Sequence, residues 1–205
     1  MITVVTGATG DAGRATSAAL LDAGHTVVAV GSDAGRLETV AASVRLVCDL
    51  TDPQATAQLA FRIRSEAGPA EALIHLVGGW RGGHENDDWE WLEPRVLTSL
   101  RLASIALADD LAAAPTGRLI TIGSVAEMKP TWGGANYAVL KAAASAWVGA
   151  VASGWRKAGT AAAVELVVQS IGDDGTTPQT IAAKVLEILA ADATTVNGSR
   201  IDLTA

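Results

Sequence analysis

The sequence predicts an α/β fold, a three-layer, doubly wound arrangement in which helices cover both faces of a mostly parallel sheet of about seven strands. Short β-branched runs alternate with longer helical segments along the chain, and this alternation is typical of parallel sheets. Several short runs are apolar throughout, as in strands buried on both faces. With 205 residues, 49% of them hydrophobic, the chain fits one domain over residues 1–205.

Seven β-branched runs predict strands, at Ile2–Val5, Thr26–Val30, Arg45–Cys48, Ala72–Val77, Arg118–Ile122, Ala163–Val168 and Arg200–Leu203. Six longer segments between them predict helices, at Ala12–Ala23, Ala34–Ala42, Pro53–Ala67, Trp91–Ala113, Asn136–Ala158 and Pro178–Ala191. No linker or internal repeat interrupts this order. Ligands of such sheets bind beyond the carboxyl ends of the strands, so the loops that follow strands are the candidate functional segments.

The composition excludes several classes of protein. A single cysteine, Cys48, rules out an intramolecular disulfide. The net charge of −7, without a lysine or arginine cluster, makes nucleic acid a poor partner. The N-terminus lacks the features of a signal peptide, and the alanine-rich stretch 135–155, which contains Lys141, predicts a buried or interface helix rather than a membrane span. We therefore expect a cytoplasmic protein that does not bind membranes.

The first strand runs into a glycine-rich turn, Thr6-Gly7-Ala8-Thr9-Gly10-Asp11-Ala12-Gly13, and then into a helix. In this setting Gly7 allows a tight turn, Gly10 lets the backbone approach a diphosphate, and Gly13 lets the helix pack on the strand. The positive end of the helix then faces the anion. The alternative is a glycine-rich turn without a ligand. The predicted dinucleotide contacts are Gly7, Thr9, Gly10, Asp11, Ala12 and Gly13.

The end of the second strand distinguishes the two nicotinamide cofactors, because an acidic residue there binds a ribose hydroxyl and a basic residue binds a 2′-phosphate. The strand ends in the neutral pair Gly31-Ser32, with Arg14 or Arg36 as a source of positive charge and Asp33 as an argument for the opposite choice. We therefore expect NADP as the preferred cofactor and NAD as the alternative, with Ser32 as a contact.

The third strand is followed by Asp49-Leu50-Thr51-Asp52-Pro53. Asp49 is predicted to accept a hydrogen bond from the adenine amino group, with Leu50 beside it. The alternative is that Asp49 only caps the helix that begins at Pro53. Thr51 or Asp52 suits that capping position better, which leaves Asp49 free for the ligand.

Three side chains after the fifth strand predict proton-transfer chemistry. Tyr137, the only tyrosine, lies four residues before Lys141, so both side chains share one face of a helix. The lysine cation is expected to lower the pKa of the phenol towards neutral, as a general acid requires. Ser124 ends the fifth strand at the ligand edge of the sheet, where its hydroxyl can hold a carbonyl oxygen. The alternatives are an incidental pair on a helix and a serine that caps the strand end.

Together these motifs resemble the short-chain dehydrogenase/reductase family, over nearly the whole chain. The resemblance implies a dinucleotide-binding Rossmann fold and a nicotinamide-dependent oxidoreductase acting on a carbonyl or alcohol. It implies that Tyr137 is the acid/base, that Lys141 binds the ribose and tunes Tyr137, and that Ser124 orients the carbonyl. Further cofactor contacts then fall on Val77, Gly78, Ile122, Tyr137, Lys141, Gly172 and Thr176. Ser99 takes the place of an asparagine that holds a water in the family's proton relay.

The sequence also departs from the family pattern. His75-Leu76-Val77-Gly78 replaces Asn-Asn-Ala-Gly after the fourth strand, and we interpret His75 as a packed strand residue. Few residues separate Gly172 from the helix at Pro178, so the substrate loop of related enzymes is absent or minimal. An open site for a bulky substrate, a pocket completed by another subunit, and loss of catalysis each explain this deletion.

The tryptophans bear on the substrate. Trp80, Trp89, Trp91 and Trp132 lie in loops that start at the ligand edge, where they either wall a pocket or pack under the loops. The segment from Gly78 to Gly83 also resembles dihydropteridine reductases, which suggests a planar aromatic or quinonoid substrate. The acidic residues near His84 lack the spacing of metal ligands, so no metal site is expected.

Small residues on most faces of the helix at Asn136–Ala158 allow another helix to approach closely. The family resemblance implies that this helix and Trp91–Ala113 build the interface of a homodimer or homotetramer, and the alternative is a helix simply buried against the sheet. The main functional prediction is an NAD(P)-dependent oxidoreductase with a small-molecule substrate. The alternative is a dinucleotide-binding sensor or scaffold with little turnover. A nucleotide-sugar epimerase is a third hypothesis, and the lack of room for a substrate domain argues against it.

Overall fold

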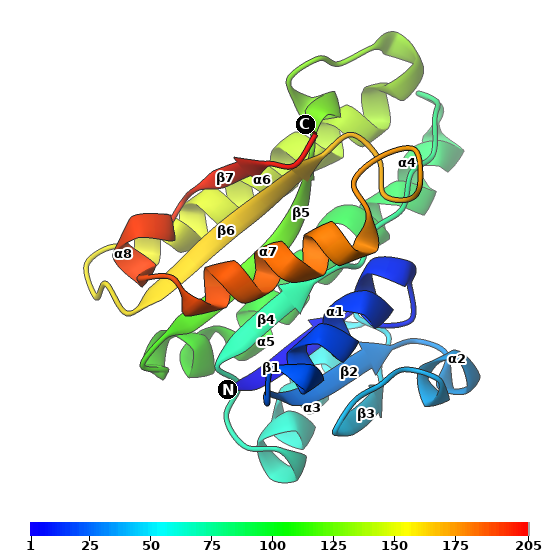
Figure 1. Cartoon of the computed structure of the whole chain (residues 1–205). Helices are drawn as coiled ribbons and strands as arrows, with labels where there is room; N and C mark the ends of the chain where they lie inside the picture. Colours follow the sequence, from blue (N-terminus) through cyan, green and yellow to red (C-terminus); the bar gives the residue numbers. More distant parts are fainter. Residues whose placement is uncertain (205) are drawn as a thin grey trace.

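The computed structural model describes residues 1–204, which form three layers around one sheet (Figure 1). Seven strands lie in the order β3-β2-β1-β4-β5-β6-β7, and every strand pair is parallel. The strands are β1 (Ile2–Thr6), β2 (Thr26–Gly31), β3 (Val44–Val47), β4 (Ala72–His75), β5 (Gly117–Ser124), β6 (Ala161–Val168) and β7 (Arg200–Asp202). The predicted fold class is therefore confirmed, with a sheet that is parallel throughout.

Helices cover both faces of the sheet (Figure 1). One face carries α1 (Asp11–Asp22), α2 (Ala34–Glu38), α7 (Pro178–Ala190) and the short α8 (Ala193–Val196). The other carries α3 (Pro53–Glu66), α5 (Ser99–Ala113) and α6 (Ala135–Trp155). Alternate strand residues point to opposite layers, so Val4 and Leu73 belong to one core while Val5 and Ile74 belong to the other.

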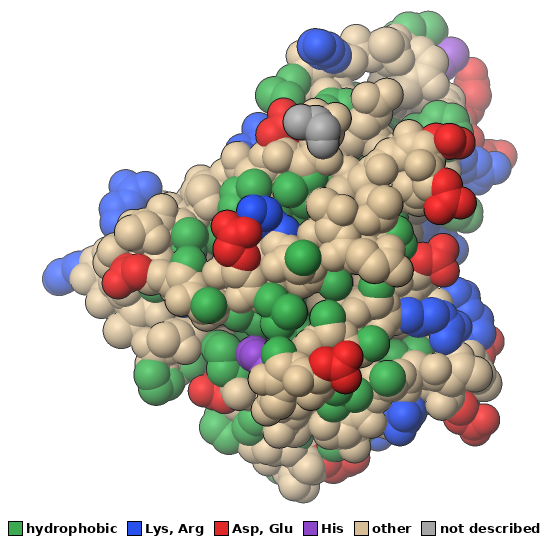
Figure 2. Space-filling model, in the orientation of Figure 1, with side chains coloured by type: hydrophobic (Ala, Val, Ile, Leu, Met, Phe, Trp, Pro, Cys, Tyr) green, Lys and Arg blue, Asp and Glu red, His purple; other side chains and the backbone are tan. Residues whose placement is uncertain are grey.

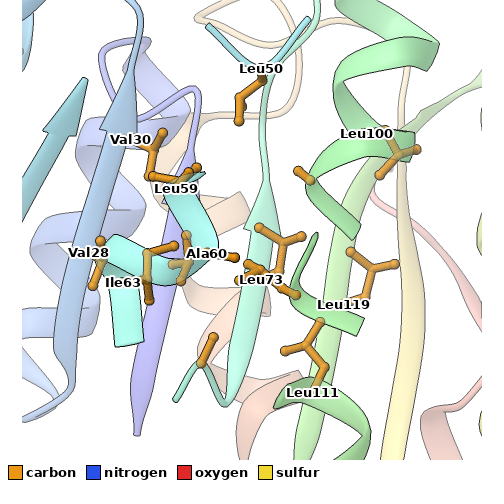
Figure 3. Close-up of a cluster of buried hydrophobic side chains, with 14 of the residues drawn as sticks. Val28, Val30, Leu50, Leu59, Ala60, Ile63, Leu73, Leu100, Leu111 and Leu119 are labelled. Atoms are coloured by element: carbon orange, nitrogen blue, oxygen red, sulfur yellow. The ribbon is translucent and has the colours of Figure 1, made fainter. Parts of the chain in front are cut away.

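Figure 3 shows the core on the α3–α5 face, where strand residues such as Val28 and Leu119 meet Leu59 and Ile63 of α3 and Leu111 of α5. These strand side chains are completely buried. Removing one leucine or isoleucine side chain from water contributes about 2 kcal/mol, so these contacts hold the helices at fixed positions on the sheet. The strand ends that carry the candidate site are fixed in turn.

The order of the strands creates a switch point. β1 pairs with β2 on one side and with β4 on the other, so the chain leaves β1 in opposite directions in the two halves of the sheet. In doubly wound sheets the ligand crevice lies beyond the carboxyl ends of the strands at such a point. Here that position is the space between the turn after β1 and the segment after β4.

The predicted helix at Trp91–Ala113 differs most from the structure. It begins earlier, as α4 (Asn86–Glu93), passes through a π-helical turn, η1 (Pro94–Thr98), and continues as α5. Pro94 has no N–H to donate and its ring crowds the preceding turn, so the hydrogen-bond spacing widens locally. The turn places Ser99 at the start of α5, beside the end of β4.

Smaller differences concern element ends. The predicted helix at Ala34–Ala42 stops at Glu38, and α8 and the 3₁₀ turns η2 (Val125–Glu127) and η3 (Trp132–Gly134) were not predicted. Residues 169–177 join β6 to α7 through a tight turn, in which the Gly172 N–H donates to the Thr176 carbonyl at 3.1 Å. In residues 1–204, no helix combines the length and apolar character that a membrane crossing requires.

Candidate functional site

Two glycines of the turn after β1 are required by the fold itself. Gly7 has a φ of 70°, and a Cβ there would lie 2.7 Å from the Leu76 carbonyl. A Cβ on Gly13 would lie 2.3 Å from the Gly7 carbonyl oxygen. Gly10 differs, because the nearest atom to a Cβ there is 3.6 Å away. Packing within the chain therefore does not explain Gly10, whereas close approach of a ligand would.

The N-terminus of α1 opens from this turn. Gly10 is its N-cap, so no side chain satisfies the first backbone N–H groups. These N–H groups and the positive end of the helix dipole suit a diphosphate. Ala12 and Gly13 lie in the buried part of this turn and support it from below, whereas Asp11 lines a shallow cleft beside Gly172.

Two clefts run along the carboxyl edge of the sheet. The first has a volume of about 570 Å³ and extends over the ends of β1, β2, β3 and β4. The second has a volume of about 510 Å³ and lies over β4, β5 and β6. They share Leu76, Val77 and Gly78, so they form one elongated site that crosses the switch point. Of the predicted contacts, the first holds Gly7, Thr9, Gly10, Ser32, Asp49, Leu50 and Ser99, and the second holds Ile122, Tyr137 and Lys141.

The end of β2 is basic. The side chains of Arg14 and Arg36 both donate to the Thr9 carbonyl at 3.2 Å, and Arg36 lines the first cleft with Ser32. Basic side chains gather where the turn after β1 meets α2 (Figure 2). Asp33 instead caps α2, because its carboxylate accepts the Arg36 N–H at 2.8 Å. The acidic residue of this segment therefore caps a helix, while Arg36 lines the first cleft and Arg14 lines the shallow cleft with Asp11.

Asp49 is held in a fixed orientation at the mouth of the first cleft. Its Oδ1 accepts hydrogen bonds from the backbone N–H and the hydroxyl of Thr51, at 2.9 and 2.7 Å. These bonds lower the pKa of the Asp49 carboxyl, and the charge of Arg95 acts in the same direction. Asp52 caps α3 by accepting the Gln54 N–H at 2.8 Å, so the capping role falls where the sequence favoured it.

His75 is a buried strand residue, as predicted. Its Nδ1 lies 2.8 Å from the Thr6 hydroxyl and its Nε2 lies 3.3 Å from the Ser99 hydroxyl. Burial lowers the pKa of His75 to about 3, and the charge of Lys141 acts in the same direction, so the imidazole is neutral. Ser99 is itself buried and donates to the Arg95 carbonyl at 2.8 Å. Its hydroxyl is therefore already paired within the protein.

Tyr137, Lys141 and Ser124 converge at the end of β5. Lys141 lies one turn after Tyr137 on α6, and its Nζ is 5.8 Å from the centre of the tyrosine ring. The same Nζ donates to the Ile122 carbonyl at 2.8 Å, which fixes the lysine against β5. Ser124 caps η2, since its Oγ accepts the Ala126 N–H at 3.2 Å, and its side chain acts to lower the pKa of the Tyr137 phenol.

We expected the pKa of Tyr137 to be lowered, and that expectation is wrong. Burial raises the pKa of the phenol above its ordinary value, the hydrogen bond with Ser124 acts against that rise, and Glu127 adds to it. Burial lowers the pKa of Lys141 to about 8. The cause of the discrepancy is desolvation, which disfavours the phenolate, while the lysine ammonium is bonded to Ile122. Tyr137 therefore holds its proton at neutral pH.

The Thr176 side chain is engaged within the protein. Its side chain is buried and its hydroxyl donates to the Leu203 carbonyl at 2.8 Å, so it ties the turn after β6 to the C-terminal segment. Gly172 has a φ of 136° and lies in the shallow cleft with Asp11 and Arg14. The cofactor contacts of Gly172 and Thr176 stay predictions, and the hydroxyl of Thr176 is already paired within the protein.

One of the tryptophans lines the second cleft, whereas two others pack against the loops after β4 and β5. Trp80 is 72% exposed and lines the second cleft, as a pocket wall would. Trp91 packs beneath the loop: a Cβ on Gly79 would lie 2.8 Å from its ring, and the Arg95 guanidinium lies 4.4 Å from its centre. Trp132 lies 4.4 Å from the His84 ring, and the Gly83 N–H donates to the Gly133 carbonyl at 2.7 Å. The loops after β4 and β5 thus form one rim.

Several residues that line the clefts were not predicted. The first cleft also contains Cys48, Thr51, Leu76, Pro94 and Arg95, and the second also contains Gln169, Ser170 and Ile171. The spacing of Arg95 and Ser99, four residues apart, could have placed the arginine on the same helical face as Ser99. The segment 169–171 follows a predicted strand, so the strand-end rule was sufficient to find it.

The fold and the site together define a class of dinucleotide-binding α/β proteins with a tyrosine–lysine–serine group at the sheet edge. The family model for short chain dehydrogenases matches residues 1–172, and the chain belongs to that family. It is 29% identical over 150 residues to a 3-oxoacyl-(acyl-carrier-protein) reductase of Salmonella typhimurium, and 30% identical over 155 residues to a 2,3-dihydro-2,3-dihydroxybenzoate dehydrogenase of Bacillus subtilis. These matches cover 69% and 70% of this chain.

The matched segment spans 62% and 59% of these two relatives, which is less than two thirds of their length. Solved structures agree on the fold. The ligand-free aldohexose dehydrogenase of Thermoplasma acidophilum gives a TM-score of 0.86 at 18% identity, covering 98% of this chain and 91% of its own. A variant of the actinorhodin polyketide ketoreductase with NADPH gives 0.88 at 16% identity, covering 99% and 95%.

Proposed function

We propose that this protein is an NADP(H)-dependent oxidoreductase that transfers hydride between the nicotinamide and a carbonyl or alcohol substrate. The observation that carries the proposal is that Tyr137 and Lys141 line one end of the elongated site, with the buried Ser124 beside Tyr137. The first cleft suits the adenosine and diphosphate, because it combines the open Gly10, the free N-terminus of α1 and the basic end of β2.

The bound nicotinamide would supply or accept the hydride. In the direction of reduction, Tyr137 donates its phenolic proton to the carbonyl oxygen as negative charge develops there. Ser124 donates a hydrogen bond to the same oxygen and fixes its distance from the phenol. Lys141 binds the ribose hydroxyls and stabilises the phenolate that remains. The raised pKa of Tyr137 supports this direction, because a protonated phenol is the form that donates.

The choice of NADP over NAD rests on charge at the end of β2. Arg36 and Arg14 meet there, and Ser32 adds a hydroxyl, so a 2′-phosphate finds donors of opposite charge. Asp33 argues for the opposite choice, and its carboxylate caps α2 by accepting the Arg36 N–H. Asp49, oriented by Thr51, is proposed to accept from the adenine amino group.

The substrate side of the site is open and partly aromatic. The tight turn at 169–177 leaves no helix over the second cleft, and the exposed Trp80 forms one wall. This arrangement supports a planar aromatic or quinonoid compound as an alternative to a simple carbonyl. The same open site is the observation that favours the second candidate function, a dinucleotide-binding sensor with little turnover.

Replacement of Tyr137 by phenylalanine tests the proposed chemistry. The variant should lose turnover by about a thousandfold, since general acid catalysis contributes roughly 10²–10⁴-fold. NADPH affinity should stay within a few-fold, because the phenol donates its proton to the substrate. The measurement is NADPH oxidation over a panel of carbonyl and quinone substrates, with binding followed by energy transfer from tryptophan.

The outcome separates the two candidates. Wild-type turnover that persists in the phenylalanine variant would contradict the role of Tyr137. Saturable NADPH binding without turnover of any panel substrate by the wild type would favour the sensor. A Trp89→Phe variant serves as the matched control for the binding signal, because Trp89 lies outside both clefts.

A further inference from the structure

Two buried carboxylates near Lys141 share one arginine partner. Glu165 of β6 and Glu127 of η2 have side chains that are 3% and 6% exposed. Arg200 of β7 joins them: its Nε donates to Glu165 Oε2 at 2.7 Å, and its terminal nitrogen pairs with Glu127. Ser145 of α6 donates to the same Glu165 oxygen at 2.9 Å. We call these four residues the acidic network.

The network is built from the elements that carry the site. Tyr137, Lys141 and Ser145 are spaced by four residues on α6, so they form one row along the helix. Glu165 pairs in register with Thr121 of β5, one residue before the Ile122 carbonyl that holds Lys141. Glu127 follows Ser124 by one turn of η2. A displacement of the two carboxylates would therefore change the electrostatic environment of Lys141.

The charges of this region balance only when Lys141 is included. Within the network, Arg200 supplies one positive charge for two carboxylates. A buried carboxylate without a charged partner is strongly disfavoured inside a protein. The Lys141 side chain is itself buried and supplies the second positive charge. The four ionic groups thus form a neutral set.

The groups that face Lys141 act in opposite directions. Burial lowers the pKa of its ammonium to about 8, while the charges of Glu165 and Glu127 oppose that fall. From β4, His75 faces it as a neutral imidazole, and on its own helix Tyr137 faces it as a neutral phenol. Arg200 is held by the two carboxylates. The negative charge that keeps Lys141 protonated therefore comes from the network.

We infer that Glu165 and Glu127 are positioning residues of the proposed site, whose excess negative charge keeps the buried Lys141 ammonium charged around neutral pH. This inference rests on the proposed function for its catalytic consequence but not for its electrostatic one. Without the carboxylates, the lysine would release its proton at lower pH. It would then no longer stabilise the Tyr137 phenolate, although its contact with Ile122 would remain.

The electrostatic part is tested without any substrate. Lysine labelled with ¹³C and ¹⁵N gives a signal for each of the four lysines, and a Lys141→Arg variant identifies the one from Lys141. Titration by NMR then gives its midpoint in the wild type, in Glu165→Gln and in Glu127→Gln. Glutamine keeps the shape and hydrogen-bonding oxygen of glutamate and removes the charge. We expect the Lys141 midpoint to fall by about one pH unit in each variant.

A matched control removes the same charge from the surface. Glu187 lies on α7 with a side chain that is 66% exposed and pairs with Lys184, so Glu187→Gln should leave the Lys141 midpoint in place. Should Glu165→Gln fail to fold, as judged by its melting curve, Glu127→Gln decides the question. Midpoints in the network variants that match the control would overturn the inference.

Activity gives a second, separable readout. The alkaline limb of kcat/KM should move down by the same amount in the two network variants, with little change in KM for the cofactor. Lower midpoints in a protein without turnover would support the electrostatic inference while the proposed function failed. An alkaline limb that stays in place while the Lys141 midpoint falls would show that the network does not serve catalysis, and would overturn the positioning role.

Discussion

Tyr137 and Lys141 share a helical face, but each is controlled by a different neighbour. The lysine ammonium is held by the Ile122 carbonyl at 2.8 Å, and the phenol meets Ser124. Burial raises the pKa of the phenol and lowers the pKa of the ammonium, so both changes reduce the tendency to form charged groups. In the proposed mechanism, the phenol therefore keeps its proton until negative charge develops on the carbonyl oxygen, and the Lys141 ammonium then stabilises the phenolate that remains.

Arg36 should set the cofactor preference. In an Arg36→Gln variant the dissociation constant for NADPH should rise about tenfold, since a lost charge-assisted hydrogen bond to phosphate costs about 1.5 kcal/mol or more. The dissociation constant for NADH should change little. Parallel titrations of both cofactors measure the two constants, with the exposed Arg156→Gln as the control. Equal weakening of NADH and NADPH would place Arg36 elsewhere than at the 2′-phosphate.

At the scale of elements, alternation of apolar runs and helical segments was sufficient to predict every strand of the sheet. The predicted ends of helices and strands were wrong where a single contact determines where an element ends. The π-helical turn at Pro94 follows from the proline ring, and its effect on hydrogen-bond spacing is not visible in periodicity. Thr176 donates to Leu203, a residue distant in sequence, so its hydroxyl could not be assigned from local pattern.

The candidate site was also predicted only where local sequence pattern determines it. Gly10, Asp49 and Lys141 line the clefts, and local sequence could point to them because each follows a strand or has a helical spacing. Glu165 and Arg200 were not predicted, because nothing in two separate strands shows that their side chains meet. Their ion pair at 2.7 Å depends on the register of β6 with β7. Long-range pairing of this kind requires the structure.

Two glycines of the first turn allow a test of what this element does. Gly13→Ala places a methyl group 2.3 Å from the Gly7 carbonyl oxygen, where backbone cannot move away cheaply. The free energy of unfolding should fall by about 2–3 kcal/mol, as overpacking in a tight contact does. Gly10→Ala has 3.6 Å of clearance and should keep the stability of the wild type. Urea denaturation followed by tryptophan fluorescence measures both values.

The matched variant then reports on the ligand. If a diphosphate approaches the turn at Gly10, the alanine there should weaken NADPH binding at least tenfold without loss of stability. A Gly10→Ala protein that binds NADPH as tightly as the wild type would remove the turn from the proposed cofactor site. A protein destabilised as much as Gly13→Ala would mean that Gly10 serves packing instead.

At the scale of the whole molecule, one face of the fold remains apolar and exposed. The outward side of α6 carries a stripe of mostly small side chains, made up of Val139, Ala142, Ala146, Gly149, Ala150 and Ser153. Ile105 of the neighbouring α5 is 49% exposed, and the two helices are joined by the Trp147 indole, which donates to Ser104 at 2.9 Å. Small residues let a second pair of helices approach closely, so we propose a second copy of this chain as the partner.

Ala146→Glu tests this assembly. A carboxylate in the middle of a close helical interface would be buried without a partner, so the variant should become a monomer, while glutamate is well tolerated on an exposed helix. Light scattering coupled to size-exclusion chromatography gives the mass of each form. Ala57→Glu, at an exposed position of α3, is the control and should keep the oligomeric state of the wild type. A monomeric wild type, or an Ala146→Glu variant of unchanged mass, would leave the α5–α6 face without a role in assembly.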